Sequence, residues 1–292
     1  MDVTRGSETT DSFPPEGVNL DRPSIARIYD YYLGGDANWA IDREFGDKVK
    51  EAFPLAVSAA KANRQFLFRV VRHLMRLGVR QFVDLGAGLP TMDHTHSVAD
   101  AYEPGTARVV YVDNEPVAVA HSQILLEQQG DPRRHTAINA DLRAPGRLWQ
   151  QVLDTGLIDL SQPVGLLMIA VLHVQQLDEH GRDMGADVVA RYRELLPSGS
   201  YLAISHATNE GVPPAIAEQM VELKAMYDQS SSPVIWRTHQ EIAALFGDFE
   251  LVEPGLTWTP SWHPEESVSR ADDPVFAHPG ESIAYAGIAR KP

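Results

Sequence analysis

The residues with the clearest chemical meaning lie in QFVDLGAGLPT (81–91), where a short apolar run carries Asp84 and is followed by Gly86 and Gly88. Glycines two positions apart leave the main chain bare, so a ligand can approach it closely. Pro90 suits the first turn of a helix, whose free N–H groups would face the same ligand. The segment therefore predicts a binding turn between a strand and a helix.

Two further aspartates end apolar runs later in the chain. Asp113 closes VVYVD (109–113), and Asp141 follows INA (138–140). A carboxylate at the end of the second strand can accept hydrogen bonds from the hydroxyls of a ribose, and one after the third can reach an adenine amino group. Any one of these acids could instead cap the following helix. Three aspartates at successive predicted strand ends favour a nucleoside site.

Two classes of nucleoside cofactor use such a turn. The dinucleotide signature needs a third glycine, where this chain has Thr91, and an acid about 20 residues further on. Here Asp113 follows Gly86 by 27 residues. S-adenosylmethionine has no phosphate and needs only two small residues and an acid on the next strand. The pattern favours S-adenosylmethionine and leaves an NAD(P)-dependent oxidoreductase as the less favoured alternative.

These residues require alternating strands and helices to position them. Short β-rich runs predict strands at 81–85, 108–113, 136–140, 164–171, 200–205, 249–256 and 282–290. Helices are expected at 24–32, 41–52, 55–77, 91–102, 116–128, 145–153, 186–196, 213–228 and 239–246. Strands separated by helices of this length imply crossover connections and a parallel sheet, so the predicted fold class is α/β.

The composition limits the partners and the compartment. The 292-residue chain has a net charge of −15, which disfavours a nucleic acid partner. It has no cysteine, which excludes disulfides, thiolate nucleophiles and cysteine-based zinc sites. No apolar run approaches the roughly 20 residues of a membrane span, and the N-terminus lacks a secretory apolar core. We expect a soluble, cytoplasmic protein without a metal or a membrane partner.

Several segments together resemble a bacterial family. They are DYYLGGDANWAIDREF, ANRQFLFRVVRHL, FVDLGAGLPT, VVYVDNEPVAVAH, INADLRAP, VLHV, GSYLAISHAT, FELVEPGL and YAGIARKP. The family is one of class I S-adenosylmethionine-dependent methyltransferases, formerly described as a domain of unknown function. The resemblance implies a Rossmann-like fold with a seven-stranded, mostly parallel sheet, an antiparallel last strand and an N-terminal helical lid. It divides the chain into a flexible arm (1–22), the lid segment (23–78) and the methyltransferase domain (79–292).

The resemblance also implies a set of cofactor contacts. The expected contacts of the methionine and the ribose are Asp84, Gly86, Ala87, Gly88, Ala170 and Val171. Asp113 and Asn114 are expected to hold the ribose and the adenine, and Asp141 and Leu142 to contact the adenine. The lid is expected to contribute Tyr32, Gly34, Gly35 and Asn38.

His173, just after the fourth predicted strand, is the candidate catalytic residue. Methyl transfer from a sulfonium is an in-line displacement that depends mainly on positioning, so a base is needed only for a protonated acceptor. An imidazole titrates near neutral pH and can take that proton. Alternatively, His173 is a polar residue that forms a hydrogen bond where the loop begins and has no catalytic role. His206, after the fifth predicted strand, is a weaker candidate for the same role of a general base.

The acceptor is not specified by the sequence. The N-P-P-Y type of motif, which marks amino-group methylation of adenine or glutamine, is absent from VLHVQQLDE (171–179). We expect a small-molecule acceptor, with a non-catalytic cofactor-binding protein as the second alternative. Trp258 and Trp262, in a long late loop, could line the acceptor or anchor the loop.

Overall fold

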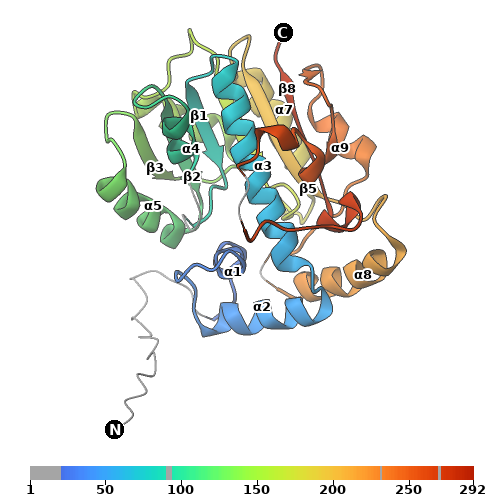
Figure 1. The fold of residues 1–292 in the computed structure, drawn as a ribbon. Helices are drawn as coiled ribbons and strands as arrows, with labels where there is room; N and C mark the ends of the chain where they lie inside the picture. The colour runs from blue at the N-terminus through green and yellow to red at the C-terminus, as the bar shows by residue number, and fades with distance from the viewer. Residues whose placement is uncertain (1–20, 90–93, 231, 269–270) are drawn as a thin grey trace.

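The computed structural model describes residues 21–89, 94–230, 232–268 and 271–292. Nearly all of the expected arm, together with Pro90 and Thr91, lies outside these ranges. A mostly parallel sheet forms the centre of the molecule (Figure 1). Its parallel strands are β1 (Gln81–Leu85), β2 (Arg108–Asp113), β3 (His135–Asn139), β4 (Gly165–Ile169) and β5 (Tyr201–Ala207).

The strand order determines where a ligand can bind. The parallel strands lie in the order β3-β2-β1-β4-β5, so the order reverses between β1 and β4. Open α/β sheets bind ligands beyond the carboxyl ends of the strands at such a switch point. The predicted parallel α/β fold is confirmed, and its binding edge lies where the sequence places Asp84 and Asp113.

The predicted antiparallel last strand is confirmed, but this end of the sheet contains one strand more than expected. β8 (Ala284–Arg290) pairs with β5, and two short strands, β6 (Glu250–Leu251) and β7 (Thr257–Trp258), pair with β8. The described residues therefore form an eight-stranded sheet rather than a seven-stranded one. The single strand predicted over 249–256 is wrong in extent, because Gly255 has a φ of +81° and closes a turn that interrupts it.

Helices cover both faces of the sheet. One face carries α3 (Ala56–Arg76), α4 (Thr95–Tyr102) and α5 (Pro116–Gln129). The other carries α6 (Pro145–Asp154), α7 (Gly185–Leu195) and α9 (His239–Leu245). Side chains alternate along each strand, so Phe82 belongs to the first core and Val83 to the second.

A third core lies beyond the carboxyl edge of the sheet. It is formed by α1 (Ile25–Tyr32), α2 (Ala40–Ala52), α8 (Pro214–Asp228) and the first part of α3. In Figure 1, α1 and α2 lie at the foot of the sheet near α8, and α3 runs upward from them across the sheet. Ala59 packs in this third core, whereas Phe66 and Leu74 pack in the sheet core. One helix therefore joins the N-terminal helices to the sheet.

The loop between β7 and β8 packs on α3. Arg69, a buried residue of α3, donates a hydrogen bond to the Trp262 carbonyl at 2.7 Å. Trp262 is fully buried against Phe66, with 5.3 Å between ring centroids, and Trp258 stacks on Tyr285 at 4.0 Å. Both tryptophans thus anchor the loop, which is one of the two roles considered for them. Across the described ranges, no helix combines the length and the apolar character needed to cross a bilayer.

Candidate active site

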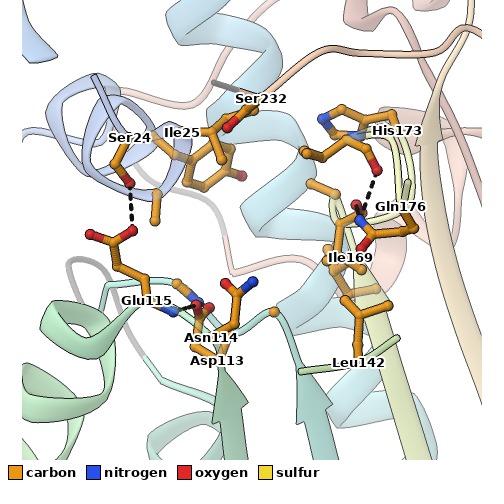
Figure 2. Close-up of a pocket in the computed structure, with 18 of the residues that line it drawn as sticks. Ser24, Ile25, Asp113, Asn114, Glu115, Leu142, Ile169, His173, Gln176 and Ser232 are labelled. Atoms are coloured by element: carbon orange, nitrogen blue, oxygen red, sulfur yellow. Dashed lines mark hydrogen bonds between the residues drawn. The ribbon is translucent and has the colours of Figure 1, made fainter. Parts of the chain in front are cut away.

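A pocket of about 510 Å³ opens at the carboxyl ends of β1, β2 and β4. Figure 2 shows Ser24 and Ile25 of the α1 region on one side and residues 113–115, at the end of β2, facing them. His173 and Gln176, from the loop after β4, form a further wall. The volume falls within the roughly 300–1,000 Å³ typical of cofactor and ligand sites.

The glycine turn after β1 has one tight and one open position. Gly86 and Gly88 have φ values of +70° and +66°, which favour glycine. A Cβ on Gly86 would come within 2.5 Å of Cγ2 of Val171, whereas one on Gly88 would meet nothing within 4 Å. Ala87 and both glycines line the pocket. The bare main chain at Gly88 is therefore where a ligand can lie close to the turn.

Asp113 is held by main-chain donors at the end of β2. Its Oδ2 accepts a hydrogen bond from the Gly88 N–H at 2.8 Å, and its Oδ1 accepts one from the Glu115 N–H at 2.8 Å. Burial raises the pKa of Asp113, and these N–H groups oppose that rise. A carboxylate can accept about four hydrogen bonds, so it retains capacity for a ligand. Asp113 and Asn114 both line the pocket.

Asp84 and Arg64 bring opposite charges to the β1 side of the pocket. Asp84 is buried, and its Oδ2 accepts a hydrogen bond from Oγ1 of Thr95 at 2.8 Å. Burial raises the pKa of Asp84 to about 6, although the Thr95 hydroxyl and the Arg64 charge act to lower it. Arg64, from α3, lines the pocket with Asp84. Such a pair complements a ligand group that carries both charges.

A chain of hydrogen bonds supports the end of β4. Ala170 has a φ of +56°, a strained value for a residue with a side chain, and its N–H donates to Oγ of Ser205 at 2.9 Å. The Ser205 hydroxyl donates to Oδ1 of Asn63, and Nδ2 of Asn63 donates to the Tyr29 hydroxyl at 3.0 Å. The Tyr29 hydroxyl donates in turn to the Ala60 carbonyl at 3.0 Å. The pocket wall at β4 is thus held by β5, α3 and α1.

His173 contributes a ring nitrogen that the protein itself does not use. Its Nδ1 is buried and has no hydrogen-bond partner among the described residues. Burial and then the Arg237 charge lower the pKa of His173 to about 4, so the ring is neutral at neutral pH. His206 differs, because carbonyl oxygens and the Arg237 guanidinium lie against its ring nitrogens. Its role is therefore to hold the loop after β4.

A smaller cavity of about 120 Å³ adjoins the pocket. It lies between α1, α2, α3 and α8 and the adjoining ends of β4, β5 and β8. The residues that line both spaces are Ile25, Tyr29, Asn63, Ala170 and His173. The two spaces therefore meet beside the end of β4.

Comparison with known proteins identifies the family. Residues 11–292 match the model of the S-adenosyl methyltransferase family. This chain belongs to that family. The methyltransferase has the Rossmann-like class I fold and uses S-adenosylmethionine, as the resemblance implied.

Two solved structures are similar to this methyltransferase over nearly their whole length. A candidate methyltransferase from Thermobifida fusca YX is 35% identical, with a TM-score of 0.81, and the match covers 96% of this chain and 98% of that one. A DUF574 family protein from Streptomyces avermitilis MA-4680 is also 35% identical, with a TM-score of 0.81 and coverage of 93% and 98%. Among curated proteins, none matches the chain.

The sequence-predicted residues of the methyltransferase fall into two groups. Those that line the larger pocket are Asp84, Gly86, Ala87, Gly88, Asp113, Asn114, Leu142, Ala170, Val171 and His173. Those outside its lining are Tyr32, Gly34, Gly35, Asn38 and Asp141.

The second group has local partners that explain its position. Nδ2 of Asn38 donates to Oδ2 of Asp30 at 2.8 Å and to the Gly35 carbonyl at 2.9 Å, so these residues build the turn between α1 and α2. Tyr32 lines the smaller cavity instead. The carboxylate of Asp141 pairs with Arg143 at 2.6 Å.

Two polar residues that α3 brings to the site were not among the residues predicted from the sequence. Asn63 and Arg64 lie on a helix that we predicted from its apolar periodicity, and both are buried. Polar side chains within an apolar helix face are a signal that was present in the sequence. No group of three or more histidine, aspartate or glutamate side chains in the described part of the chain is placed to hold a metal ion.

Proposed function

We propose that the pocket at the ends of β1, β2 and β4 binds S-adenosylmethionine and that the enzyme methylates a small-molecule acceptor. The observation that carries this proposal is the position of Asp113. It lines the pocket at the end of β2 and accepts a hydrogen bond from Gly88, whose outer side is open. A carboxylate beside bare main chain suits a ribose with two hydroxyls.

The rest of the lining supports this orientation. Asn114 and Leu142, on the β2 and β3 side, would flank the adenine. Asp84 and Arg64 would hold the amino and carboxylate groups of the methionine. Because the carboxylate of Asp141 forms an ion pair with Arg143, we assign Asp141 no direct contact with the cofactor.

The lid acts through α1 rather than through the turn that follows it. Ser24, Ile25 and Tyr29 line the pocket, and Oγ of Ser24 donates to Oε2 of Glu115 at 3.1 Å. The contact closes the pocket between α1 and the end of β2. Tyr32, Gly34, Gly35 and Asn38 would then shape the lid without touching the cofactor.

When bound, S-adenosylmethionine supplies a methyl group that its sulfonium already activates. The protein therefore chiefly has to position the acceptor and exclude water. The chain from Ala170 through Ser205 to Asn63 fixes the wall at which the acceptor would lie. Neutral His173 can accept a proton at Nδ1, and its lowered pKa means that this transfer would accompany bond formation rather than precede it.

Substitution of Asp113 tests the cofactor site. Loss of a charge-assisted hydrogen bond costs roughly 1.5–3 kcal/mol, so Asp113→Asn is expected to weaken S-adenosylmethionine binding at least tenfold by titration calorimetry. Asp131→Ala serves as the control and should bind S-adenosylmethionine as the parent does. Asp131 precedes β3 and therefore lies at the amino ends of the strands, far from the pocket. Parental affinity in Asp113→Asn, with the fold intact by circular dichroism, would refute the placement. NADH titrated into the parent enzyme should give no heat of binding.

A further inference from the structure

The smaller cavity has an uncharged, aromatic wall. No lysine, arginine, aspartate or glutamate of the described residues lines it. Five aromatic side chains contribute to its wall, namely Tyr29, Tyr32, Phe53, Tyr227 and Trp236. The larger pocket, by contrast, carries charges of both signs, including Arg64, Asp84 and Asp113. The cavity would therefore reject an ionised group, which loses its hydration there without gaining a partner.

Most polar groups in the cavity wall are already hydrogen-bonded to one another. Ser205, Asn63 and Tyr29 form the chain that begins at the Ala170 N–H. The contacts of His206 with carbonyl oxygens and Arg237 engage its ring nitrogens. Nδ1 of His173 and the hydroxyl oxygen of Tyr32, by contrast, are buried without a hydrogen-bond partner among the described residues, and of the two only His173 also lines the larger pocket. A ligand in the cavity therefore finds a polar group for one hydroxyl at the junction with the larger pocket.

The size of the cavity limits the group that enters it. Its volume is about 120 Å³, and apolar protein cavities of about 150 Å³ accept benzene. Aromatic walls favour an aromatic guest through edge-to-face contacts, which contribute roughly 0.5–1.5 kcal/mol per ring pair. The space thus fits a single six-membered ring, with any substituent directed toward the larger pocket.

We propose that the methyl acceptor is a small neutral phenol, whose ring occupies this cavity and whose hydroxyl lies against Nδ1 of His173. This inference rests on the proposed function and adds the acceptor class and the methylated atom. The hydroxyl oxygen forms the new bond to the methyl carbon as the carbon–sulfur bond breaks with its electron pair left on sulfur. The hydroxyl proton passes to Nδ1 of His173, so the products are an aryl methyl ether and S-adenosylhomocysteine.

A charge series on the parent enzyme tests the acceptor class without any mutation. The full-length protein is saturated with S-adenosylhomocysteine and titrated by calorimetry with phenol, benzyl alcohol and benzoate. We expect phenol to bind at one site and benzoate, which matches benzyl alcohol in size, to bind at least tenfold more weakly than benzyl alcohol. Benzoate binding equal to that of benzyl alcohol, or no phenol binding, would overturn the inference.

Cavity-filling variants test the location. Ala59→Leu places a larger side chain in the cavity wall and should weaken phenol binding at least tenfold while leaving S-adenosylhomocysteine affinity within twofold of the parent. Ala52→Leu, on α2 outside the lining, is the matched control and should bind both ligands as the parent does. Ala56→Leu provides a second cavity variant should Ala59→Leu fold poorly.

The outcomes separate this inference from the proposed function. If the parent fails to bind S-adenosylhomocysteine, the cofactor site itself is wrong. If it binds S-adenosylhomocysteine but phenol affinity is unaffected by both cavity variants, the cofactor site stands and the acceptor cavity is refuted. Selective loss of phenol binding in Ala59→Leu or Ala56→Leu supports both.

Discussion

At the scale of single residues, position 86 is a glycine because the side chain of Val171 leaves no room there for a Cβ. Cγ2 of Val171 lies where a Cβ on Gly86 would be, within 2.5 Å, whereas the side of Gly88 is open. The two glycines of one motif therefore serve different purposes. Gly86 lets the ends of β1 and β4 come together, and Gly88 leaves open space in the pocket, where we propose that the cofactor binds.

Substitution of Gly86 should cost stability in two separable parts. Gly86→Ala places a side chain at a φ of +70° and against Val171, which we expect to lower the free energy of unfolding by roughly 2–4 kcal/mol in urea titrations. Gly86→Ala/Val171→Ala should recover the part due to overpacking. Gly146→Ala, in α6 with open space around it, should be close to neutral. A fully stable Gly86→Ala protein would show that the contact with Val171 is loose.

At the scale of elements, an ion-pair network links α1 to the strand that carries Asp113. Arg27 is buried on α1, and its Nε pairs with Oδ2 of Asp42 at 2.8 Å while its Nη1 pairs with Oε1 of Glu115 at 2.9 Å. Asp42 belongs to α2 and Glu115 follows β2. The position of α1 thus depends on a contact beside the larger pocket.

Neutralising Glu115 should loosen α1 selectively. Glu115→Gln removes one charge from the network and leaves the pair between Arg27 and Asp42 in place. A charge-assisted contact at this partly exposed position is worth roughly 1 kcal/mol, so amide hydrogen exchange in Ile25–Tyr32 should accelerate about fivefold. Exposed Glu222 on α8 gives the control variant Glu222→Gln. Unchanged exchange in α1 would mean that the helix is held by apolar packing alone.

The strand-end residues could be predicted from sequence because they follow apolar runs. Asp84 and Asp113 sit where short β-rich segments stop, and parallel strands bring such ends together. Two other features depend on contacts between segments far apart in the chain. Asn63 reaches β5 through Ser205, 142 residues away, and four helices contribute to the wall of the smaller cavity. The periodicity of apolar residues within one segment predicts neither the Asn63–Ser205 contact nor the cavity.

Element boundaries were predictable where local signals were strong. β1 and β2 have the predicted bounds, 81–85 and 108–113. The strand over 249–256 was wrong because Pro254 and Gly255 form a turn that separates β6 from β7. The domain boundary after residue 78 stays a prediction, and α3, which it assigns to the lid segment, contributes to two cores.

At the scale of the whole molecule, buried neutral histidines should make the fold sensitive to acid. Burial lowers the pKa of His96 to about 3, that of His173 to about 4 and that of His206 well below its usual value. In the unfolded chain these imidazoles take up protons below pH 6.5. The folded state cannot do so until a lower pH, so stability is lost as the pH falls below 6.5.

The free energy of unfolding is therefore expected to fall between pH 7 and pH 5. Each imidazole kept neutral costs roughly 2 kcal/mol at pH 5, so buried His96 and His206 alone give a loss on the order of 4 kcal/mol. Asp84 acts in the opposite sense, because its pKa is raised from 3.8 to about 6, but its protonation restores only roughly 1 kcal/mol over this range. Urea titrations at several pH values measure the slope. Stability that is flat or rising toward pH 5 would contradict the buried neutral rings.

The two spaces of the site take their walls from different parts of the chain. The larger pocket is built mainly on turns that follow strands, whereas α1, α2, α3 and α8 contribute half of the residues that line the smaller cavity. If the acceptor binds in the smaller cavity as proposed, exchange of helix side chains such as Val49 or Leu223 changes which compound is modified and leaves the lining of the larger pocket intact. Relatives with one donor can diverge in this way toward many chemistries, and an engineer can retarget the enzyme from the same positions.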